Sequence, residues 1–206
     1  MSSTTLDPYT AKAENTSLSA QEKIAGLHEI VKSAKTGMLT THGSDGHLHS
    51  RAMIPTSRKS NAAFDDTQLS LVFIANNATG KFDEIRNDSH VNVSFCDTNT
   101  TSWASYSGTA TVSQNKELIH KHFHSSMSAY FGDLKDGVHK GNAEDPRISV
   151  IEVVPQEIHY WVATKGHLAR AADAAMSKVT GNASAPGELR TISQSEIQLT
   201  QNLNNK

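Results

Sequence analysis

Short runs of alternating polar and apolar residues, separated by turn-forming residues, fill the middle of this 206-residue chain. Such runs are typical of antiparallel strands. Pro155 cannot donate to a sheet ladder, so it is expected to separate the last two runs. The strands do not alternate regularly with helices, which predicts a mainly β fold, an antiparallel barrel of six or seven strands with flanking helices. The predicted strands span residues 37–41, 47–55, 69–75, 90–96, 103–112, 147–154 and 158–162.

Helical signals lie around this block of strands. Ser19 and Glu22 form a capping box, which predicts a helix from there to about residue 34. Residues 1–18 are rich in Ser and Thr and are expected to form a disordered arm. Residues 19–165 are expected to form the barrel domain, and residues 166–206 a C-terminal extension of helix and loop. Further helices are expected at about 80–87, after 113 to about 123, at 168–179 and weakly after 193.

The charge and cysteine content exclude several classes of function. The formal net charge is −2, so nothing favours nucleic acid or an anionic membrane as a partner. The single cysteine, Cys96, allows no intrachain disulfide and fits a reducing compartment. Neither a secretory signal nor a membrane span is expected. The sequence therefore predicts a cytoplasmic protein.

A polar turn after the third predicted strand carries the first chemical signal. The run from Ile74 to Phe82 ends a buried strand, turns, and begins a helix. Thr79 is predicted as its N-cap, and Lys81 lies in the first helical turn, where the helix dipole disfavours a cation. Backbone N–H groups, a threonine hydroxyl and a lysine suit a phosphate monoester. The alternative is an ordinary capped surface helix whose Lys81 points to water.

Arg51 gives a second, independent signal. It interrupts a predicted strand that has one face toward the core, and an inward arginine needs a fixed anion. The alternative is an arginine on the solvated face of the barrel. Two basic residues at strand edges, each next to a hydroxyl group, favour a phosphate pocket more than either residue alone.

These segments, taken in order, resemble the pyridoxamine 5′-phosphate oxidase-like flavin-binding split barrels, and within them the general stress proteins and their fungal blue-light-inducible relatives. The resemblance covers about residues 20–165 and continues in a fungal-type tail between 181 and 192. The carrying segments are 36–41, 45–53, 73–81, 91–95, 105–110 and 160–161.

The resemblance implies a split β-barrel homodimer with FMN at the subunit interface; FAD also fits, because its adenylate could extend into solvent. It implies that Arg51, Thr79 and Lys81 hold the phosphate and that Met53 lies near the ring. Trp103, Ser105 and Trp161 would come from the partner chain, with core packing as the alternative for both indoles. The expected cofactor-binding residues are His49, Ser50, Arg51, Ala52, Met53, Ile74, Ala75, Asn76, Thr79, Lys81, Trp103, Ser105 and Trp161.

The chain also departs from the oxidase pattern. Gly80 stands where the oxidase has a second basic residue, and the substrate-binding Arg-Leu-His is absent, although Arg170 remains a candidate for the phosphate. Oxidation of pyridoxamine phosphate is therefore not expected. The sequence predicts a flavin-dependent oxidoreductase of unknown substrate linked to stress or light, with no catalytic residue identified. The alternative is a flavin-binding stress protein that stores, buffers or senses flavin without turnover.

The eleven histidines invite a metal interpretation. His120, His122 and His124 alternate, but no H-E-x-x-H pattern accompanies them, so no metal site is expected. Some split barrels bind heme, and His49 and His167 are the candidate ligands for that alternative.

Overall fold

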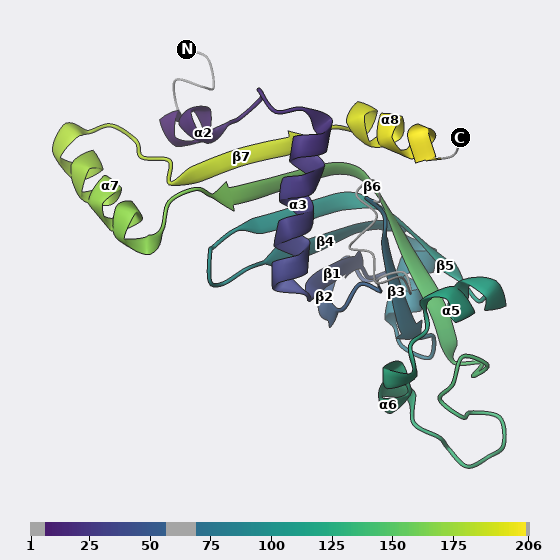
Figure 1. Ribbon diagram of the computed structural model, residues 1–206. Helices are drawn as coiled ribbons and strands as arrows, with labels where there is room; N and C mark the ends of the chain where they lie inside the picture. The colour runs from purple at the N-terminus through teal and green to yellow at the C-terminus, as the bar shows by residue number, and fades with distance from the viewer. Residues whose placement is uncertain (1–6, 57–68, 205–206) are drawn as a thin grey trace.

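The structure is a computed structural model that describes residues 7–56 and 69–204. A single antiparallel sheet curls through it in the order β2-β1-β4-β5-β6-β3, with β7 also paired to β6 (Figure 1). The predicted mainly β fold with flanking helices is confirmed. The strands are β1 (Gly37–His42), β2 (Leu48–Met53), β3 (Leu71–Asn76), β4 (His90–Cys96), β5 (Trp103–Ser113), β6 (Ile148–Ala163) and β7 (Gly187–Ile192).

Strand β6 corrects the prediction that Pro155 separates two strands, because it runs unbroken through the proline. The register between β5 and β6 shifts between Ser107 and Gly108, and Gly108 lies opposite Pro155. A Cβ at Gly108 would lie 2.2 Å from the carbonyl oxygen of Val154, so only glycine permits this approach. The bulge accommodates the residue that lacks an N–H, and the sheet bends without ending.

Both ends of the chain contain more structure than expected. Helix α2 (Pro8–Ala13) replaces part of the expected disordered arm, with Asp7 as its N-cap and Ala13 buried. The predicted tail loop contains β7, which extends the sheet beside β6. A parallel bridge joins Glu14 to Leu189 of β7, so each terminal segment supplies the other's partner. Local composition missed this pairing because it is a tertiary contact.

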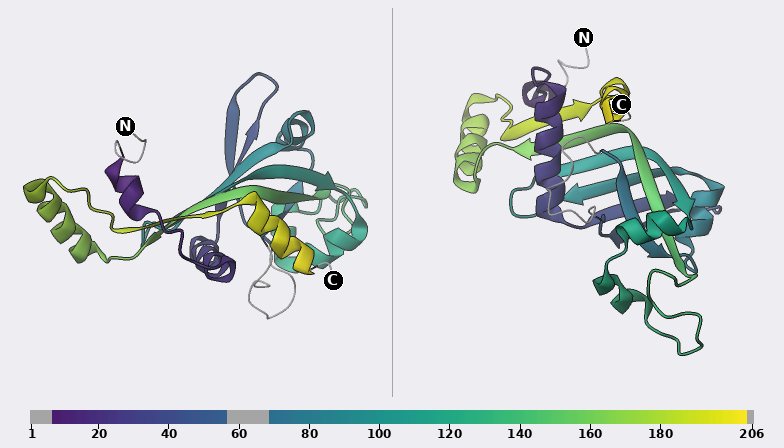
Figure 2. Two further views of the ribbon diagram at one scale, coloured as in Figure 1. Left: turned by 90° about the horizontal axis from the view of Figure 1, so that it is seen from above. Right: turned by 45° about the vertical axis from the view of Figure 1, so that its right-hand side comes forward.

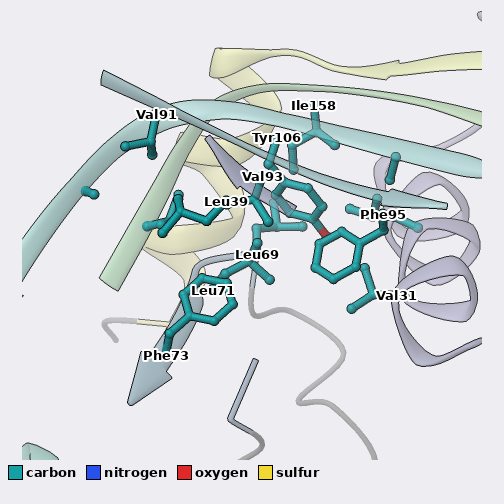
Figure 3. Close-up of a cluster of buried hydrophobic side chains, with 14 of the residues drawn as sticks. Val31, Leu39, Leu69, Leu71, Phe73, Val91, Val93, Phe95, Tyr106 and Ile158 are labelled. Carbon is teal, nitrogen blue, oxygen red and sulfur yellow. The ribbon is translucent and has the colours of Figure 1, made fainter. Parts of the chain in front are cut away.

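The helices divide between the two sides of the sheet. Helix α3 (Ala20–Ala34) begins at the predicted capping box of Ser19 and Glu22 and packs against the core. That core includes Leu39, Phe73, Val93 and Tyr106 (Figure 3). A smaller cluster lies under α5. The remaining helices are α4 (Lys81–Asn87), α5 (Lys116–His122), the 3₁₀ turn Ser125–Met127, α6 (Ser128–Phe131), α7 (His167–Thr180) and α8 (Gln194–Asn204).

The sheet presents two different faces at its β1-β4-β5 region. We call the side with Leu39, Val93 and Phe95 the core face, since α3 covers it. The opposite side carries Met38, which is 41 % exposed, and Trp103, which is 37 % exposed, and we call it the open face. Helix α2 lies on the other side of the sheet from α3 (Figure 2, left).

Helix α7 projects beyond the end of the sheet (Figure 1). Its apolar side chains Leu168 and Val179 are exposed, while Arg170 bonds to Thr101 in the β4–β5 turn and Asp173 bonds to Lys165 just before the helix. The helix therefore shows its apolar side to solvent, the reverse of a usual surface helix. Among the described residues, no helix is long and apolar enough to cross a membrane.

Candidate functional site

A cluster of charged side chains lies where β1, β2 and α4 meet, on the core face. Its centre is Glu84 of α4, not one of the residues singled out from the sequence. Nη2 of Arg51 lies 2.6 Å from Oε2 of Glu84, and Nδ1 of His49 lies 2.7 Å from its Oε1. Thr41 donates its hydroxyl hydrogen to Glu84 and accepts a hydrogen bond from Arg51. The inward Arg51 thus has its fixed anion within the chain.

The protonation of Glu84 follows from these contacts. Its partial burial alone would raise the pKa of the carboxyl, but hydrogen bonds from Thr41, His49 and Arg51 lower that pKa to about 2. The carboxylate is therefore charged at all physiological pH values and neutralises one of the two neighbouring cations.

Lys81 is the second cation of the cluster. Burial lowers the pKa of its ammonium group, and the positive charge of Arg51 lowers it further, with a partial offset from Glu84. Nζ of Lys81 donates to the hydroxyl of Thr79 and lies 5.4 Å from the ring centroid of Phe82. Within residues 7–56 and 69–204, Lys81 forms no salt bridge. Two cations are thus held near one another with a single carboxylate for both.

Thr79 does not cap α4 as predicted. The N-cap is Gly80, without a side-chain hydrogen bond, and the hydroxyl of Thr79 donates to the carbonyl oxygen of Asn76 at 2.8 Å. The hydroxyl instead closes the turn that follows β3 and accepts from Lys81. Thr79 therefore connects the turn to Lys81 by hydrogen bonds and does not serve as the predicted helix cap.

The segment from His49 to Met53 divides between the two faces of the sheet. Arg51 is paired with Leu39, so His49, Arg51 and Met53 share the core face, and Met53 packs against the core. Ser50 and Ala52 lie on the open face, where the hydroxyls of Ser50 and Thr40 are 2.7 Å apart. Only the first three can therefore join the charged cluster.

The end of β3 lies next to this cluster through its turn. Ala75 is in the main core, and Ile74 packs on the second cluster under α5. Asn76 accepts a hydrogen bond from the backbone N–H of Ala78 through its side chain. The backbone of this strand end thus leads directly into Thr79 and Lys81.

Trp103, Ser105 and Trp161 lie on the open face, away from the charged cluster. Trp103 is paired with Cys96 and with Trp161, and Ser105 accepts from Asn92 at 2.8 Å. Within one chain they do not meet Arg51, so their contact with the same cofactor stays a prediction that needs a second protomer.

Tyr9 of α2 covers Trp161, with ring centroids 5.7 Å apart and an interplanar angle of 11°. Tyr9 and Glu84 were both missed from the sequence. Glu84 could have been found from its position, three residues after Lys81 on the same short helix. Nothing in the sequence around Tyr9 indicates that it stacks on another aromatic ring.

The other sequence candidates lie elsewhere. Arg170 donates to Thr101 at 2.6 Å and to the carbonyl oxygen of Thr100, at the β4–β5 turn and not at the charged cluster. His49, a candidate heme ligand, is bonded to Glu84, and the side chain of His167 lies outside the described residues. Within the described part of the chain, no group of three or more His, Cys, Asp or Glu side chains could hold a metal ion.

Comparison with known proteins gives consistent matches. The protein Bli-3 of Neurospora crassa is 38 % identical over 193 residues, which cover 93 % of this chain and 90 % of that protein. A Clostridium acetobutylicum protein related to general stress protein 26 shares the fold with a TM-score of 0.57 and 15 % identity, over 86 % of this chain and 98 % of that one.

A third match is a pyridoxamine 5′-phosphate oxidase-related, FMN-binding protein of Nostoc punctiforme. Its TM-score is 0.52 at 13 % identity, over 71 % of this chain and 87 % of that one. The family model described as pyridoxamine 5′-phosphate oxidase like matches residues 22–185. The chain therefore belongs to the pyridoxamine 5′-phosphate oxidase-like family of split barrels.

Proposed function

We propose that this protein binds FMN through a phosphate site formed by Arg51, Thr79 and Lys81, and that it acts as a flavin-dependent oxidoreductase. The observation that carries this proposal is that Lys81 lies close enough to feel the charge of Arg51, while the nearby carboxylate of Glu84 is bonded to Arg51. The FMN-binding relative from Nostoc punctiforme supports the choice of cofactor.

The chemistry of the cluster fits a phosphate. Arg51 uses part of its guanidinium for Glu84 and Thr41, and Lys81 bonds to a hydroxyl and not to an acid. An incoming phosphate would relieve the repulsion that lowers the pKa of Lys81, and it would accept charge-assisted hydrogen bonds from both cations. With Glu84 ionised, Arg51 and Lys81 leave a net charge of about +1, less than a dianion prefers. The affinity is therefore expected to be modest.

The exposed apolar side chains support a homodimer. Met38 and Trp103 on the open face, and Leu168 and Val179 on α7, are all more than a third exposed. Exposed apolar groups concentrated on one sheet face and on a projecting helix are typical of an association surface. A twofold pair would bring the open face of one protomer to the other, so that Trp103 and Trp161 could reach the partner's flavin.

A bound flavin supplies hydride or electron transfer, while the chain positions it and excludes water. The described residues next to Lys81 include no unpaired acid or base, since Glu84 is ionised and His49 is bonded to it. This lack of an available acid or base supports a second candidate function, a flavin-binding protein without turnover that serves storage, buffering or sensing.

The purified protein tests both candidates. We expect it to be yellow, with flavin absorption near ~450 nm, and to bind FMN more tightly than riboflavin because only FMN carries the phosphate. Lys81→Ala should weaken FMN binding about 5- to 150-fold, as expected for one charged hydrogen bond, and leave riboflavin binding unchanged. Equal FMN affinity in the variant would contradict the phosphate site.

Anaerobic mixing with NADH or NADPH then separates the two candidates. Bleaching of the bound flavin, followed by reoxidation with an acceptor, supports the oxidoreductase. A flavin that no donor bleaches supports the protein without turnover.

A further inference from the structure

The carboxylate of Glu84 in the charged cluster has hydrogen-bonding capacity to spare. Its Oε2 accepts from Nη2 of Arg51 at 2.6 Å and from the hydroxyl of Thr41, and its Oε1 lies 2.7 Å from Nδ1 of His49. An ionised carboxylate only accepts hydrogen bonds and offers about four lone pairs. Three donors from the described residues use three of these lone pairs, so one remains for a hydrogen that a ligand donates.

The same carboxylate limits the positive charge of the cluster. Burial lowers the pKa of Lys81, the charge of Arg51 lowers it further and that of Glu84 raises it, so Lys81 lies within electrostatic reach of both. The side chains of Arg51 and Glu84 are only 23 % and 16 % exposed, and solvent therefore screens their charges incompletely. Gly80, the N-cap of α4, adds no charge. An anion at this place meets two cations and one carboxylate, which leave one net positive charge.

A site with one net positive charge discriminates between anions of different charge. The cost of removing an ion from water rises with the square of its charge, whereas its attraction to the site rises only in proportion to that charge. A second negative charge therefore adds about three times the desolvation cost of the first, but only the same attraction. Glu84 has a pKa of about 2 and is ionised at physiological pH, so it increases this imbalance by repelling the ligand.

A phosphate monoester can offer either of two charge states to such a site. It loses its second proton near pH ~6, so a singly charged and a doubly charged form exchange around neutral pH. The singly charged form keeps a P–OH group, whose hydrogen the remaining lone pair of Glu84 can accept. The dianion has acceptors alone and repels the carboxylate. Charge and hydrogen bonding therefore favour the same form.

We propose that Glu84 is a specificity-determining residue that makes the site select a singly protonated phosphate monoester, so that FMN binds together with one proton from solvent. The proposal rests on the function proposed above, because it concerns the same phosphate site. Arg51 and Lys81 supply the attraction, and Glu84 decides which charge state of the phosphate they accept.

Other titratable side chains around α4 must be separated from this effect. Besides the two cations, those on the β1–β2 hairpin and on β4 are His42, Asp45, His49 and His90. His42 and His90 bond to Asp88, at the other end of α4. Strand β5 also packs on α4, and it lines the cavity beside the helix with uncharged side chains, Ala110 and Val112. His49 bonds to Glu84 itself, and histidine is the side chain that changes charge between pH 5 and 8.

Loss of the proton of Lys81 would also weaken FMN binding as the pH rises. The two causes predict opposite results for Glu84→Gln. The charge of Glu84 raises the pKa of Lys81, so without that charge Lys81 would lose its proton at a lower pH and the fall in FMN affinity would become steeper. If Glu84 excludes the dianion, the fall should disappear in this variant.

Flavin titrations of the full-length protein, freed of bound flavin, test the proposal between pH 5 and pH 8. The measured quantity is the ratio of the affinity for FMN to that for riboflavin, which lacks the phosphate. In the parent protein we expect this ratio to fall about 3- to 30-fold as the pH rises, the scale of one charge contact in a half-buried site. In Glu84→Gln the ratio should stay constant or rise, so that FMN binds more tightly than to the parent at pH 8.

Two further variants assign the effect to the charge of Glu84. His49→Gln removes the neighbouring titratable group and should keep the fall, and Glu84→Asp keeps the negative charge and should show a fall in the same direction. A ratio independent of pH in the parent protein would overturn the proposal without any variant. A fall in Glu84→Gln as steep as in the parent, or its loss in His49→Gln, would overturn it as well.

The Lys81→Ala titration with FMN reports separately on the phosphate site. Equal FMN affinity in Lys81→Ala would reject the proposed function together with this inference. Weaker FMN affinity in Lys81→Ala, with no pH dependence of the ratio in the parent protein, would reject this inference and leave the proposed function intact.

Discussion

On the core face, Arg51 and Glu84 are joined by hydrogen bonds within one chain, whereas on the open face Tyr9 and Trp103 leave more than a third of their surface uncovered. Charged groups in a half-buried site must be satisfied even without a ligand, because an unpaired charge there is costly. Aromatic walls carry no such penalty and can stay partly open. The charged cluster is therefore closed by ion pairs within the chain, whereas the aromatic side chains on the open face line a cavity.

Removal of the Glu84 carboxylate on the core face should cause the largest loss of folding stability. Glu84→Gln leaves Arg51 with a neutral partner, and we expect a loss of about 2–3 kcal/mol in the free energy of unfolding at pH 6. Denaturant titration of both proteins measures it.

The pH dependence of that loss has a definite sign. The pKa of Glu84 is lowered from its ordinary 4.5 to about 2, so its contribution is present above pH 4.5 and is lost as the pH falls toward 2. The difference between the two proteins should therefore shrink below pH 4.5. A difference independent of pH would show that the carboxylate charge is not what stabilises the cluster.

A side chain at Gly187 should displace the indole of Trp161 on the open face. In Gly187→Ala the new Cβ would lie 2.4 Å from the carbonyl oxygen of Val162 and against Trp161. We expect destabilisation of about 1–2 kcal/mol from overpacking, together with altered tryptophan emission. Gly166→Ala, where nothing lies within 4 Å of the added Cβ, is the matched control. Unchanged tryptophan emission in Gly187→Ala would show that the added Cβ does not displace the indole of Trp161.

Lys81→Met sharpens the contrast between stability and binding. Burial and the charge of Arg51 lower the pKa of Lys81, which means that its positive charge is less favourable in the folded than in the unfolded chain. Without flavin, the variant should unfold at equal or higher denaturant concentration, by a few tenths of a kcal/mol up to about 1 kcal/mol. Its FMN binding should fall as in Lys81→Ala. A less stable variant would mean that the lysine serves the fold.

The smallest expected effect comes from the cap of α2. Asp7 accepts from the N–H of Thr10 at 3.0 Å on an exposed surface. Asp7→Ala should shift Tm by less than about 2 °C, yet loosen Tyr9 and change the emission of Trp161. Identical emission in the two proteins would show that the rest of the contacts of α2 suffice to hold the ring.

The sequence was informative where local patterns decide structure. The capping box of Ser19 and Glu22, the strand bounds around Leu39 and Val93, and the family resemblance all follow from spacing and residue type. Features that depend on tertiary contacts were not predicted from the sequence. β7 exists because β6 is long enough to pair on one edge with both β3 and β7, and Pro155 is tolerated because Gly108 lies opposite. Neither the pairing of β7 nor the tolerance of Pro155 can be predicted from the local sequence alone.

The candidate site shows the same limit. Arg51 and Lys81 were singled out for their residue types, and the structure places them near one another. Glu84 was missed because its role depends on how α4 docks on β1. The cofactor-binding roles of His49, Ser50, Ala52, Met53 and the end of β3 stay predictions, as do those of the open-face residues.

The interlocked termini have a consequence for synthesis on the ribosome. Asn15 bonds to Glu188, and Lys23 forms a 2.8 Å salt bridge with Glu196. The segment that carries Asn15 and Lys23 must therefore wait, without these partners, until residues 188–196 have been translated. Folding of this end is necessarily a late event, and a nascent chain stalled before residue 187 would leave Tyr9 unanchored and open to proteases.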